Sequence, residues 1–311
     1  MSISLKGRDF ITLADFSTEE ILHLLDTARK LKQLSHTHTP AHPLKGRTLA
    51  CIFQKPSLRT RVSLEVAMTQ LGGSALTMTA AEIGPGTREP VRDIARVLSR
   101  YVDGIAIRTF EHSMVEELAR YASVPVINAL TDYSHPCQAM GDLLTVLEVK
   151  GCLEGMKLAY VGDGNNVAVS LLLGTSRVGM SMSLACPDGY DVPEIVFEQA
   201  RQEAGKRGAT VERTRDPQEA VRGAGVVYTD VWTSMGQESQ AAIRRDVFSP
   251  YQVNKQLLKA AREDAVVMHC LPAHYGEEIT EEVVEGPRSV VFDQAENRLH
   301  AQKAILLEIL G

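Results

Sequence analysis

Short apolar runs alternate along the chain with segments whose apolar residues recur at the spacing of a helix. A short apolar run bounded by turn residues is typical of a buried strand. The pattern predicts strands at 48–53, 75–79, 104–108 and 125–129 in the first half, and at 157–161, 181–185, 210–213, 226–229, 265–268 and 289–292 in the second. Strands that alternate with helices in this way indicate parallel sheets with helices on both faces.

Helical patterns fill the intervals between these runs. Ser17 and Glu20 form the pattern of a capping box ahead of residues that are apolar at helical spacing, which predicts a helix near the N-terminus. Other helices are predicted up to residue 71, from 90, and at 115–121, 135–150 and 296–310. The segment 35–43 has two prolines and no apolar period, so it is predicted to be a loop.

The alternation is interrupted by the long helical stretch 135–150 and then restarts. The predicted fold class is therefore α/β, with two similar domains, each a parallel sheet flanked by helices. Residues 1–134, completed by the C-terminal helix 296–311, are expected to form one domain, and residues 151–290 the other. The stretch 135–150 is the expected interdomain helix, and the active site is expected in the cleft between the domains.

The composition excludes several classes of partner. With a formal net charge of −6 over 311 residues, the chain has no general attraction for nucleic acid or an anionic membrane, so any anion must be bound locally. No apolar run has the length of a membrane span or follows the pattern of a signal peptide, which predicts a cytoplasmic protein. The five cysteines are scattered without a CxxC pair and are expected to be reduced thiols. His36, His38 and His42 fit a solvated loop better than a metal site.

A cluster of polar and basic residues, Ser57 to Arg61, stands where the strand 48–53 gives way to a helix. The start of a helix offers unpaired N–H groups and the positive end of its dipole, and here it also offers hydroxyls and two arginines. This combination predicts a phosphate-binding site, although a helix start with two surface arginines is the alternative. The cluster lacks the P-loop pattern, so a nucleoside triphosphate is not the expected ligand.

Other polar residues follow predicted strands in both halves. Arg108 ends the strand 104–108, and His135 and Gln138 follow the strand 125–129. Because ligands bind at the carboxyl ends of parallel strands, these groups are expected around the same anion. Taken singly, Arg108 also fits a surface ion pair and His135 a helix cap.

The second half contains a glycine-rich turn, Gly162 to Val167, between a strand and a helix. It resembles a dinucleotide-binding fingerprint, but Val167 takes the place of the third glycine, and no acidic residue clearly ends the next strand. A nicotinamide cofactor is therefore not expected.

Asp230 and its neighbours follow the strand 226–229, and His269 and Cys270 follow the strand 265–268. Adjacent residues of a strand point to opposite faces, so His269 is poorly placed to act as a base for Cys270. A covalent cysteine nucleophile is not predicted. A buried, inert thiol is the alternative role for Cys270.

Five segments closely resemble those of the carbamoyltransferase superfamily, and they occur in the same order along almost the whole chain. They are SLRTR, HPCQ, GDGNN, DVWTSMG and HCLPA. The first two segments are specific to the superfamily, and DVWTSMG and HCLPA point to its ornithine branch. The resemblance implies transfer of the carbamoyl group of carbamoyl phosphate to the side-chain amine of L-ornithine, giving L-citrulline and phosphate. It also implies arginine biosynthesis, a homotrimer or a multiple of trimers, and no metal or organic cofactor.

The resemblance also implies the site residues. Those for carbamoyl phosphate would be Ser57, Leu58, Arg59, Thr60, Arg108, His135, Gln138, Cys270, Leu271 and Arg298. Those for ornithine would be Asn166, Asp230, Ser234 and Met235. Arg108, His135 and Cys270 would be catalytic.

Two positions depart from the family pattern. Leu58 replaces a common threonine, which removes a hydroxyl but keeps the backbone N–H. Glu82 stands where relatives commonly offer a glutamine to a neighbouring subunit, and its carboxylate would repel a phosphate unless a cation such as Arg88 compensates.

The alternatives to ornithine carbamoylation are a carbamoyltransferase for another amine, such as putrescine or a modified ornithine, an NAD-dependent dehydrogenase, and a non-catalytic binding protein. The incomplete glycine fingerprint argues against the dehydrogenase.

Overall fold

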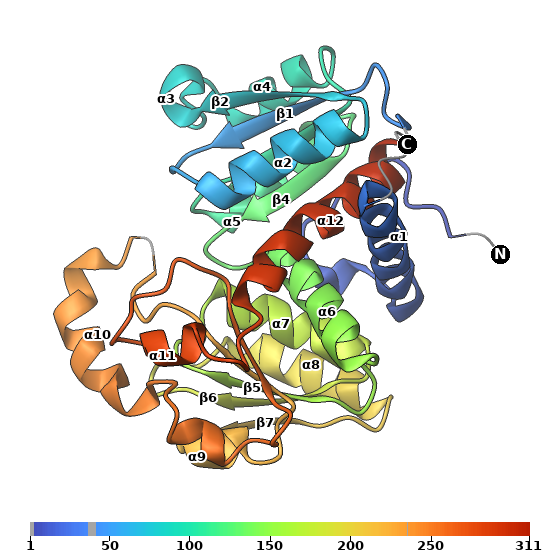
Figure 1. Cartoon of the computed structure of the whole chain (residues 1–311). Helices are drawn as coiled ribbons and strands as arrows, with labels where there is room; N and C mark the ends of the chain where they lie inside the picture. The colour runs from blue at the N-terminus through green and yellow to red at the C-terminus, as the bar shows by residue number, and fades with distance from the viewer. Residues whose placement is uncertain (1–2, 37–41, 235) are drawn as a thin grey trace. The chain divides into compact units, whose positions relative to one another are not determined.

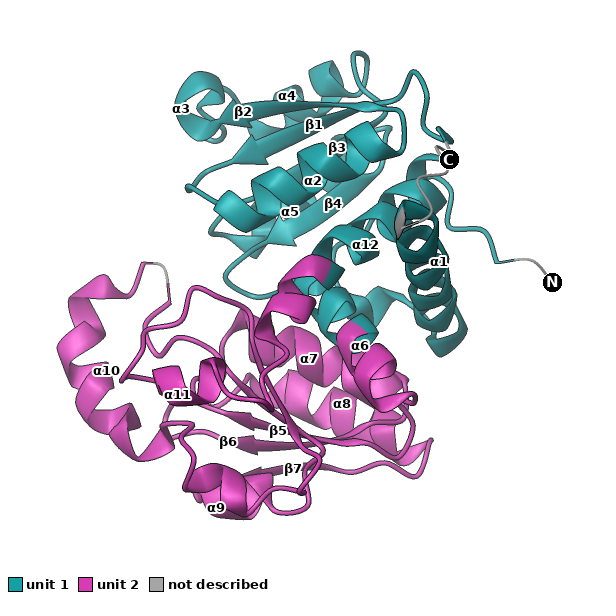
Figure 2. Cartoon of the chain, viewed as in Figure 1, with its two compact units in different colours: residues 1–144, 297–311 teal, residues 145–296 magenta. Residues whose placement is uncertain are grey.

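The computed structural model describes residues 3–36, 42–234 and 236–311. The chain forms two compact units, residues 1–144 with 297–311, and residues 145–296 (Figure 2). Two α/β units, each with a parallel sheet flanked by helices, confirm the predicted fold class. None of the described helices is long and apolar enough to cross a membrane.

The first unit contains a four-stranded parallel sheet in the order β2-β1-β3-β4 (Figures 1 and 2). Its strands are β1 (Thr48–Phe53), β2 (Ser74–Thr79), β3 (Gly104–Arg108) and β4 (Val126–Leu130). Its helices are α1 (Thr18–His36), α2 (Leu58–Gln70), α3 (Ala80–Ile83), α4 (Val91–Leu98) and α5 (His112–Tyr121). Because crossovers are right-handed, reversal of the strand order after β2 sends α4 and α5 to the face opposite α2. There Ile94 and Leu118 are buried with Ile52 and Ile107 of the strands.

The second unit contains a five-stranded parallel sheet in the order β7-β6-β5-β8-β9. Its strands are β5 (Lys157–Val161), β6 (Ser181–Ala185), β7 (Val211–Thr214), β8 (Val226–Thr229) and β9 (Val266–His269). Its helices are α7 (Asn166–Arg177), α8 (Glu194–Gly205), α9 (Pro217–Val221), α10 (Ala241–Phe248) and α11 (Glu281–Val284). Two longer helices, α6 (Pro136–Lys150) and α12 (Val291–Leu310), have residues in both units. Short 3₁₀ turns occur at Leu13–Asp15, Glu238–Gln240, Ser249–Tyr251 and Leu257–Lys259.

The helix starts follow the sequence signals closely at the N-terminus. The predicted capping box is confirmed, since Ser17 N–H donates to Glu20 Oε2 at 2.8 Å and Glu20 N–H donates to Ser17 Oγ at 3.2 Å. The helix after it reaches His36, so Ser35 and His36 do not belong to the predicted loop. The Ser35 hydroxyl donates to the carbonyl of Leu31 one turn earlier, which lets this polar residue continue the helix. His38 lies outside the described residues.

The strand predicted at 289–292 is wrong. Ser289 forms only an isolated bridge with Val267, and α12 already begins at Val291 rather than at 296. The carbonyl of Val290 accepts the N–H of Gln294, which starts the helix. A run as short as 289–292 has no measurable period, so its apolar residues suit the first turn of a helix as well as a strand.

Candidate active site

The predicted phosphate site lies where the strand order of the first sheet reverses. The chain leaves β1 for β2 on one side, and β3 then pairs with β1 on the other side. Ser57 follows β1 and Arg108 ends β3, so both stand at the carboxyl ends of these two neighbouring strands. Open α/β sheets bind their ligands at this point of the topology.

Two arginines converge on the first turn of α2. Arg108 Nη1 donates to Ser57 Oγ at 3.0 Å and to Thr60 Oγ1 at 3.4 Å, and Arg298 Nη2 of α12 donates to Thr60 Oγ1 at 2.7 Å. Thr60 and Arg298 are almost fully buried. Ser57 occupies the N-cap position, but its side chain makes no capping hydrogen bond. The N-terminus of α2 is therefore lined by two hydroxyls and two guanidinium groups.

The two arginines of the SLRTR segment have different surroundings. Arg61 is exposed and pairs with Glu65 one turn later in the helix at 3.0 Å, as expected for a surface arginine. The charge of Arg59 instead acts on His135, together with the charges of Arg108 and Arg298. The alternative of two surface arginines therefore holds for Arg61 only.

His135 is buried just before α6. Burial holds the pKa of its imidazole well below the usual range, and the positive charges of Arg298, Arg108 and Arg59 lower it further. The ring is consequently neutral at physiological pH. Gln138, also buried, donates its amide to Asp142 Oδ1 at 2.8 Å, which fixes the orientation of its side chain.

The two departures from the family pattern have different local structures. The side chain of Leu58 is 74% exposed in the first turn of α2. Glu82 accepts the N–H and the hydroxyl of Thr79 at 2.6 and 2.8 Å, and these hydrogen bonds lower the pKa of its carboxyl. Arg88 donates to the carbonyl of Glu82 and not to its carboxylate. Glu82 thus caps the short helix α3, and the hydrogen bond from Arg88 goes to its backbone carbonyl, where it does not pair with the carboxylate.

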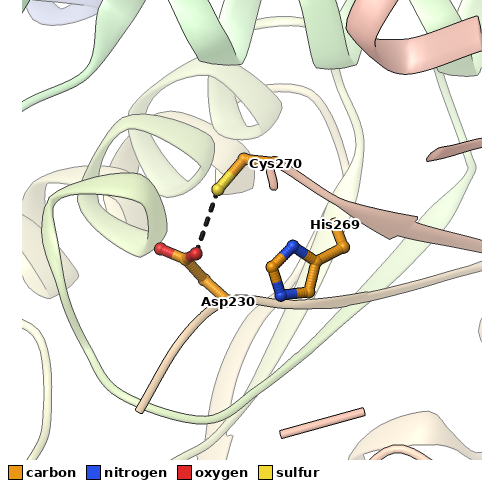
Figure 3. A group of neighbouring side chains, drawn as sticks. All are labelled: Asp230, His269 and Cys270. Carbon is orange, nitrogen blue, oxygen red and sulfur yellow. Dashed lines mark hydrogen bonds between the residues drawn. The ribbon is translucent and has the colours of Figure 1, made fainter. Parts of the chain in front are cut away.

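In the second unit the strand order reverses between β5 and β8, and a second polar group lies there. Asp230 follows β8 and is nearly buried. Its Oδ1 accepts the thiol of Cys270 at 3.0 Å (Figure 3), and its Oδ2 accepts the side-chain amide of Asn165 at 2.7 Å. The carboxylate is therefore held in one orientation by residues that follow β5 and β9.

Asn165 was missed from the sequence, where its neighbour Asn166 is the expected site residue. Its Oδ1 accepts the N–H groups of Val167 and Ala168 and so caps α7, while its amide reaches Asp230. Asn166 is the first residue of that helix and is half-buried. An asparagine directly before an apolar helix is a recognised capping signal, which was available in the sequence.

His269 and Cys270 point to different partners, although β9 ends at His269 and Cys270 lies just beyond the strand in which alternation was expected. His269 Nδ1 accepts the N–H of Leu271 and Nε2 lies 3.1 Å from Glu278 Oε1, whereas the thiol of Cys270 points to Asp230 (Figure 3). Possible metal ligands of Asp230, His269 and Cys270 lie within 4.8 Å of one another. Because both ring nitrogens of His269 have partners in the protein, this proximity alone does not make a metal site.

A buried ion pair supports the segment after Asp230. Arg244 of α10 pairs with Asp163 and donates its Nε to the carbonyl of Trp232. Its guanidinium lies 4.8 Å from the ring centre of Tyr190 and 5.2 Å from that of Phe248. Nothing in the local sequence distinguishes Arg244 from a surface arginine, because its partners are distant in the chain.

Of the two other expected site residues in this segment, Ser234 and Met235, the structure describes only Ser234. Ser234 N–H donates to Gln237 Oε1 at 3.1 Å, and Met235 lies outside the described residues. The segment is therefore held at the Trp232 carbonyl and at the Ser234 amide by residues that follow it in the chain.

The ion pair predicts a pH dependence of stability. Burial raises the pKa of Asp163 to about 6, against the opposing effect of Arg244, so below that pH the folded state binds a proton that the unfolded state lacks. As the pH falls from 7 to 4.5, the wild type should therefore gain about 1–3 kcal/mol relative to Asp163→Asn. Urea unfolding of both proteins at several pH values measures this difference. A constant difference, or one of opposite slope, would contradict the assignment.

The glycine-rich turn has a packing role that the sequence does not reveal. Gly164 N–H donates to the carbonyl of Tyr190 at 2.9 Å, and a Cβ at Gly164 would lie 2.4 Å from the backbone nitrogen of Val192. Gly164→Ala should therefore destabilise the protein by about 1–3 kcal/mol through backbone displacement. Thermal unfolding checks this, with Gly205→Ala as the control because its added Cβ meets nothing within 4 Å. Equal melting temperatures for the two variants would show that the contact is not tight.

Two family models match the chain, one in each half. The model of the aspartate/ornithine carbamoyltransferase carbamoyl-P binding domain matches residues 8–148, and that of the Asp/Orn binding domain matches residues 154–309. The chain belongs to the aspartate/ornithine carbamoyltransferase family. The resemblance seen in the sequence is confirmed over both halves of the chain.

Within this family, similar proteins are named ornithine carbamoyltransferase. Ornithine carbamoyltransferase of Anoxybacillus flavithermus is 57% identical over 309 residues, which cover 99% of this chain and 98% of that protein. The anabolic ornithine carbamoyltransferase of Pyrococcus furiosus is 53% identical over 311 residues, covering 100% and 99% of the two chains. A solved structure of the Pyrococcus furiosus enzyme has a TM-score of 0.97 at 52% identity and covers 100% of this chain and 99% of its own.

Proposed function

We infer that the protein is an ornithine carbamoyltransferase, which transfers the carbamoyl group of carbamoyl phosphate to the side-chain amine of L-ornithine and releases L-citrulline and phosphate. The observation that carries this inference is the convergence of Arg108 and Arg298 on Thr60 at the start of α2, inside the part that matches a carbamoyl-P binding domain. Putrescine or a modified ornithine as the acceptor is not favoured, because relatives over 50% identical along the whole chain are named ornithine carbamoyltransferases.

The donor site is proposed around the first turn of α2. The N–H groups of that turn, the hydroxyls of Ser57 and Thr60, and the guanidinium groups of Arg59 and Arg108 would hold the phosphate. The exposed side chain of Leu58 leaves its backbone N–H for this purpose.

The carbamoyl end needs donors that stabilise negative charge on its carbonyl oxygen. Arg108 would bridge the phosphate and this oxygen, and the neutral ring of His135 would donate its one N–H to it. Gln138 would bind the carbamoyl amide, since its side-chain carbonyl is buried while its own amide is held by Asp142. Arg298, Cys270 and Leu271 are proposed to complete this end.

The acceptor site is proposed around Asp230. Its carboxylate, already oriented by Asn165 and Cys270, would accept the α-amino group of ornithine. Asn166, Ser234 and Met235 would bind the rest of the amino-acid head.

The chemistry is attack by the neutral side-chain amine of ornithine on the carbamoyl carbon. A carbon–nitrogen bond forms, the tetrahedral intermediate collapses, the bond to phosphate breaks, and one proton passes from the amine to the leaving phosphate. Cys270 is proposed to orient the amine, and the positioning of both substrates supplies much of the rate. The residues named here need no metal or organic cofactor for these steps.

The setting of the enzyme is also a proposal. We propose a cytoplasmic homotrimer, or a multiple of trimers, that acts in arginine biosynthesis and binds neither nucleic acid nor membranes. The name of the Pyrococcus furiosus relative contains the word anabolic, which supports the biosynthetic direction.

Citrulline formation tests the proposed function. Purified protein with carbamoyl phosphate should carbamoylate ornithine in preference to putrescine, aspartate and N-acetylornithine when the four amines compete, with each carbamoylated product separated by mass. Preference for N-acetylornithine, whose α-nitrogen carries no charge, would contradict the role of Asp230. Preference for putrescine would contradict recognition of an amino-acid head, and absence of any product would contradict the transferase activity.

A further inference from the structure

The corner that follows β9 has a backbone conformation that requires support. Leu271 has a φ of +57°, in the left-handed region that is unfavourable for a residue with a branched side chain. Cys270 precedes it and donates its thiol to Asp230. The orientation of the thiol therefore depends on what holds this corner.

His269, the last residue of β9, holds the corner through a hydrogen bond with the backbone of Leu271. The N–H of Leu271 donates to His269 Nδ1 at 2.9 Å, so Nδ1 is an acceptor and the proton of the neutral ring is on Nε2. Nε2 lies 3.1 Å from Glu278 Oε1, which accepts this proton in a hydrogen bond. Both side chains have no exposed surface. The ring is therefore fixed in one tautomer and one orientation.

Glu278 also closes the loop that begins at the corner. Its Oε1 accepts the N–H of His274 at 2.6 Å, and its own carbonyl accepts the N–H of Val253 at 2.8 Å. The N–H of His269 donates to Gln294 Oε1 at 2.9 Å. The buried carboxylate of Glu278 thus joins the histidine to the loop after it, and the backbone carbonyl of the same residue joins that loop to Val253.

We propose that Glu278 and His269 are positioning residues for acceptor binding. Glu278 fixes the tautomer and orientation of His269, His269 holds the N–H of Leu271, and the corner then presents the Cys270 thiol to Asp230. This proposal rests on the proposed function, in which Cys270 and Asp230 bind the acceptor. Neither positioning residue touches the substrate.

Two substitutions at His269 separate this role from a general contribution to stability. In His269→Asn, Oδ1 is bonded to Cγ as Nδ1 is in histidine, so it can accept the Leu271 N–H. The side chain of His269→Leu has no acceptor. Both variants lose the imidazole contact with Glu278, whose Oε1 keeps the N–H of His274, so they share the cost of that loss. His269→Leu should lower kcat/KM for ornithine by about 100-fold, and His269→Asn should recover most of that loss.

A second readout does not depend on the activity. In a Cys152→Ser background the remaining cysteines other than Cys270 are buried, so iodoacetamide reports on Cys270. His269→Leu should alkylate at least threefold faster than the background protein, because its thiol is no longer held against Asp230, and His269→Asn should stay close to the background rate. The affinity for inorganic phosphate, measured by calorimetry, should be unchanged in both.

The outcomes separate this proposal from the proposed function. Equal ornithine kcat/KM and equal alkylation rates in the Asn and Leu variants would overturn the positioning role. If the wild type made no citrulline, the proposed function would fail, whereas the alkylation rates would still test the corner. If either His269 variant did not fold, Glu278→Gln, which keeps the acceptor oxygen, and Glu278→Leu, which removes it, would decide. Only the Leu variant should then alkylate faster, and equal rates would overturn the proposal.

Discussion

Arg108→Ala should reduce kcat by roughly 100- to 1,000-fold, because it removes a donor from the carbonyl oxygen on which negative charge develops. Arg108 Nη1 already reaches the hydroxyls of Ser57 and Thr60, so the guanidinium is fixed before the substrate arrives. A preorganised donor of this kind lowers the barrier by about 2.7–4 kcal/mol. The variant should also bind carbamoyl phosphate more weakly, since the same group is proposed to contact the phosphate.

Steady-state kinetics and calorimetry with carbamoyl phosphate measure these two effects separately. Arg120→Ala is a matched control, because Arg120 is an exposed arginine of α5 in the same unit. Arg108→Lys should remain impaired, since an ammonium lacks the planar set of donors with which the guanidinium would bridge the phosphate and the carbonyl oxygen. Wild-type kcat in Arg108→Ala, with unchanged circular dichroism, would remove Arg108 from the proposed mechanism.

The strands around the proposed donor site could be predicted because their limits follow from the local pattern of apolar residues. The strands 48–53 and 104–108 have the predicted limits at both ends, and parallel pairing brings their carboxyl ends together. The convergence of Ser57 and Arg108 follows from that topology alone. Arg298 is different, since it reaches Thr60 from 238 positions away and only the family resemblance pointed to it.

The acceptor site was predicted less completely because its supporting contacts are tertiary. Asp230 was identified from its place after a strand, but the partner that orients it is Asn165, one residue before the expected Asn166. Arg244 is buried only because Asp163 and two aromatic rings surround it, which no local period could indicate. Such contacts depend on the packing of distant segments, not on the pattern of one segment.

Asp230→Asn should lower kcat/KM for ornithine by roughly 10- to 150-fold, equivalent to the loss of a charged hydrogen bond of about 1.5–3 kcal/mol. The substitution keeps the shape of the side chain but removes the negative charge that would pair with the α-ammonium group. It also places an amide where two donors, from Asn165 and Cys270, now meet two carboxylate oxygens. One of those donors must then lose its acceptor, so the variant cannot keep the native orientation without cost.

Whether the loss of kcat/KM comes from ornithine binding or from carbamoyl phosphate binding identifies the role of Asp230. If Asp230 binds the amino-acid head, KM for ornithine should rise, while the affinity for carbamoyl phosphate stays within about threefold of the wild type. The preference over N-acetylornithine, whose α-nitrogen is an uncharged amide, should shrink in the variant. Asp246→Asn is the matched control, because Asp246 is an exposed aspartate of α10 in the same unit. An unchanged ornithine KM together with a weakened affinity for carbamoyl phosphate would instead assign Asp230 to the donor.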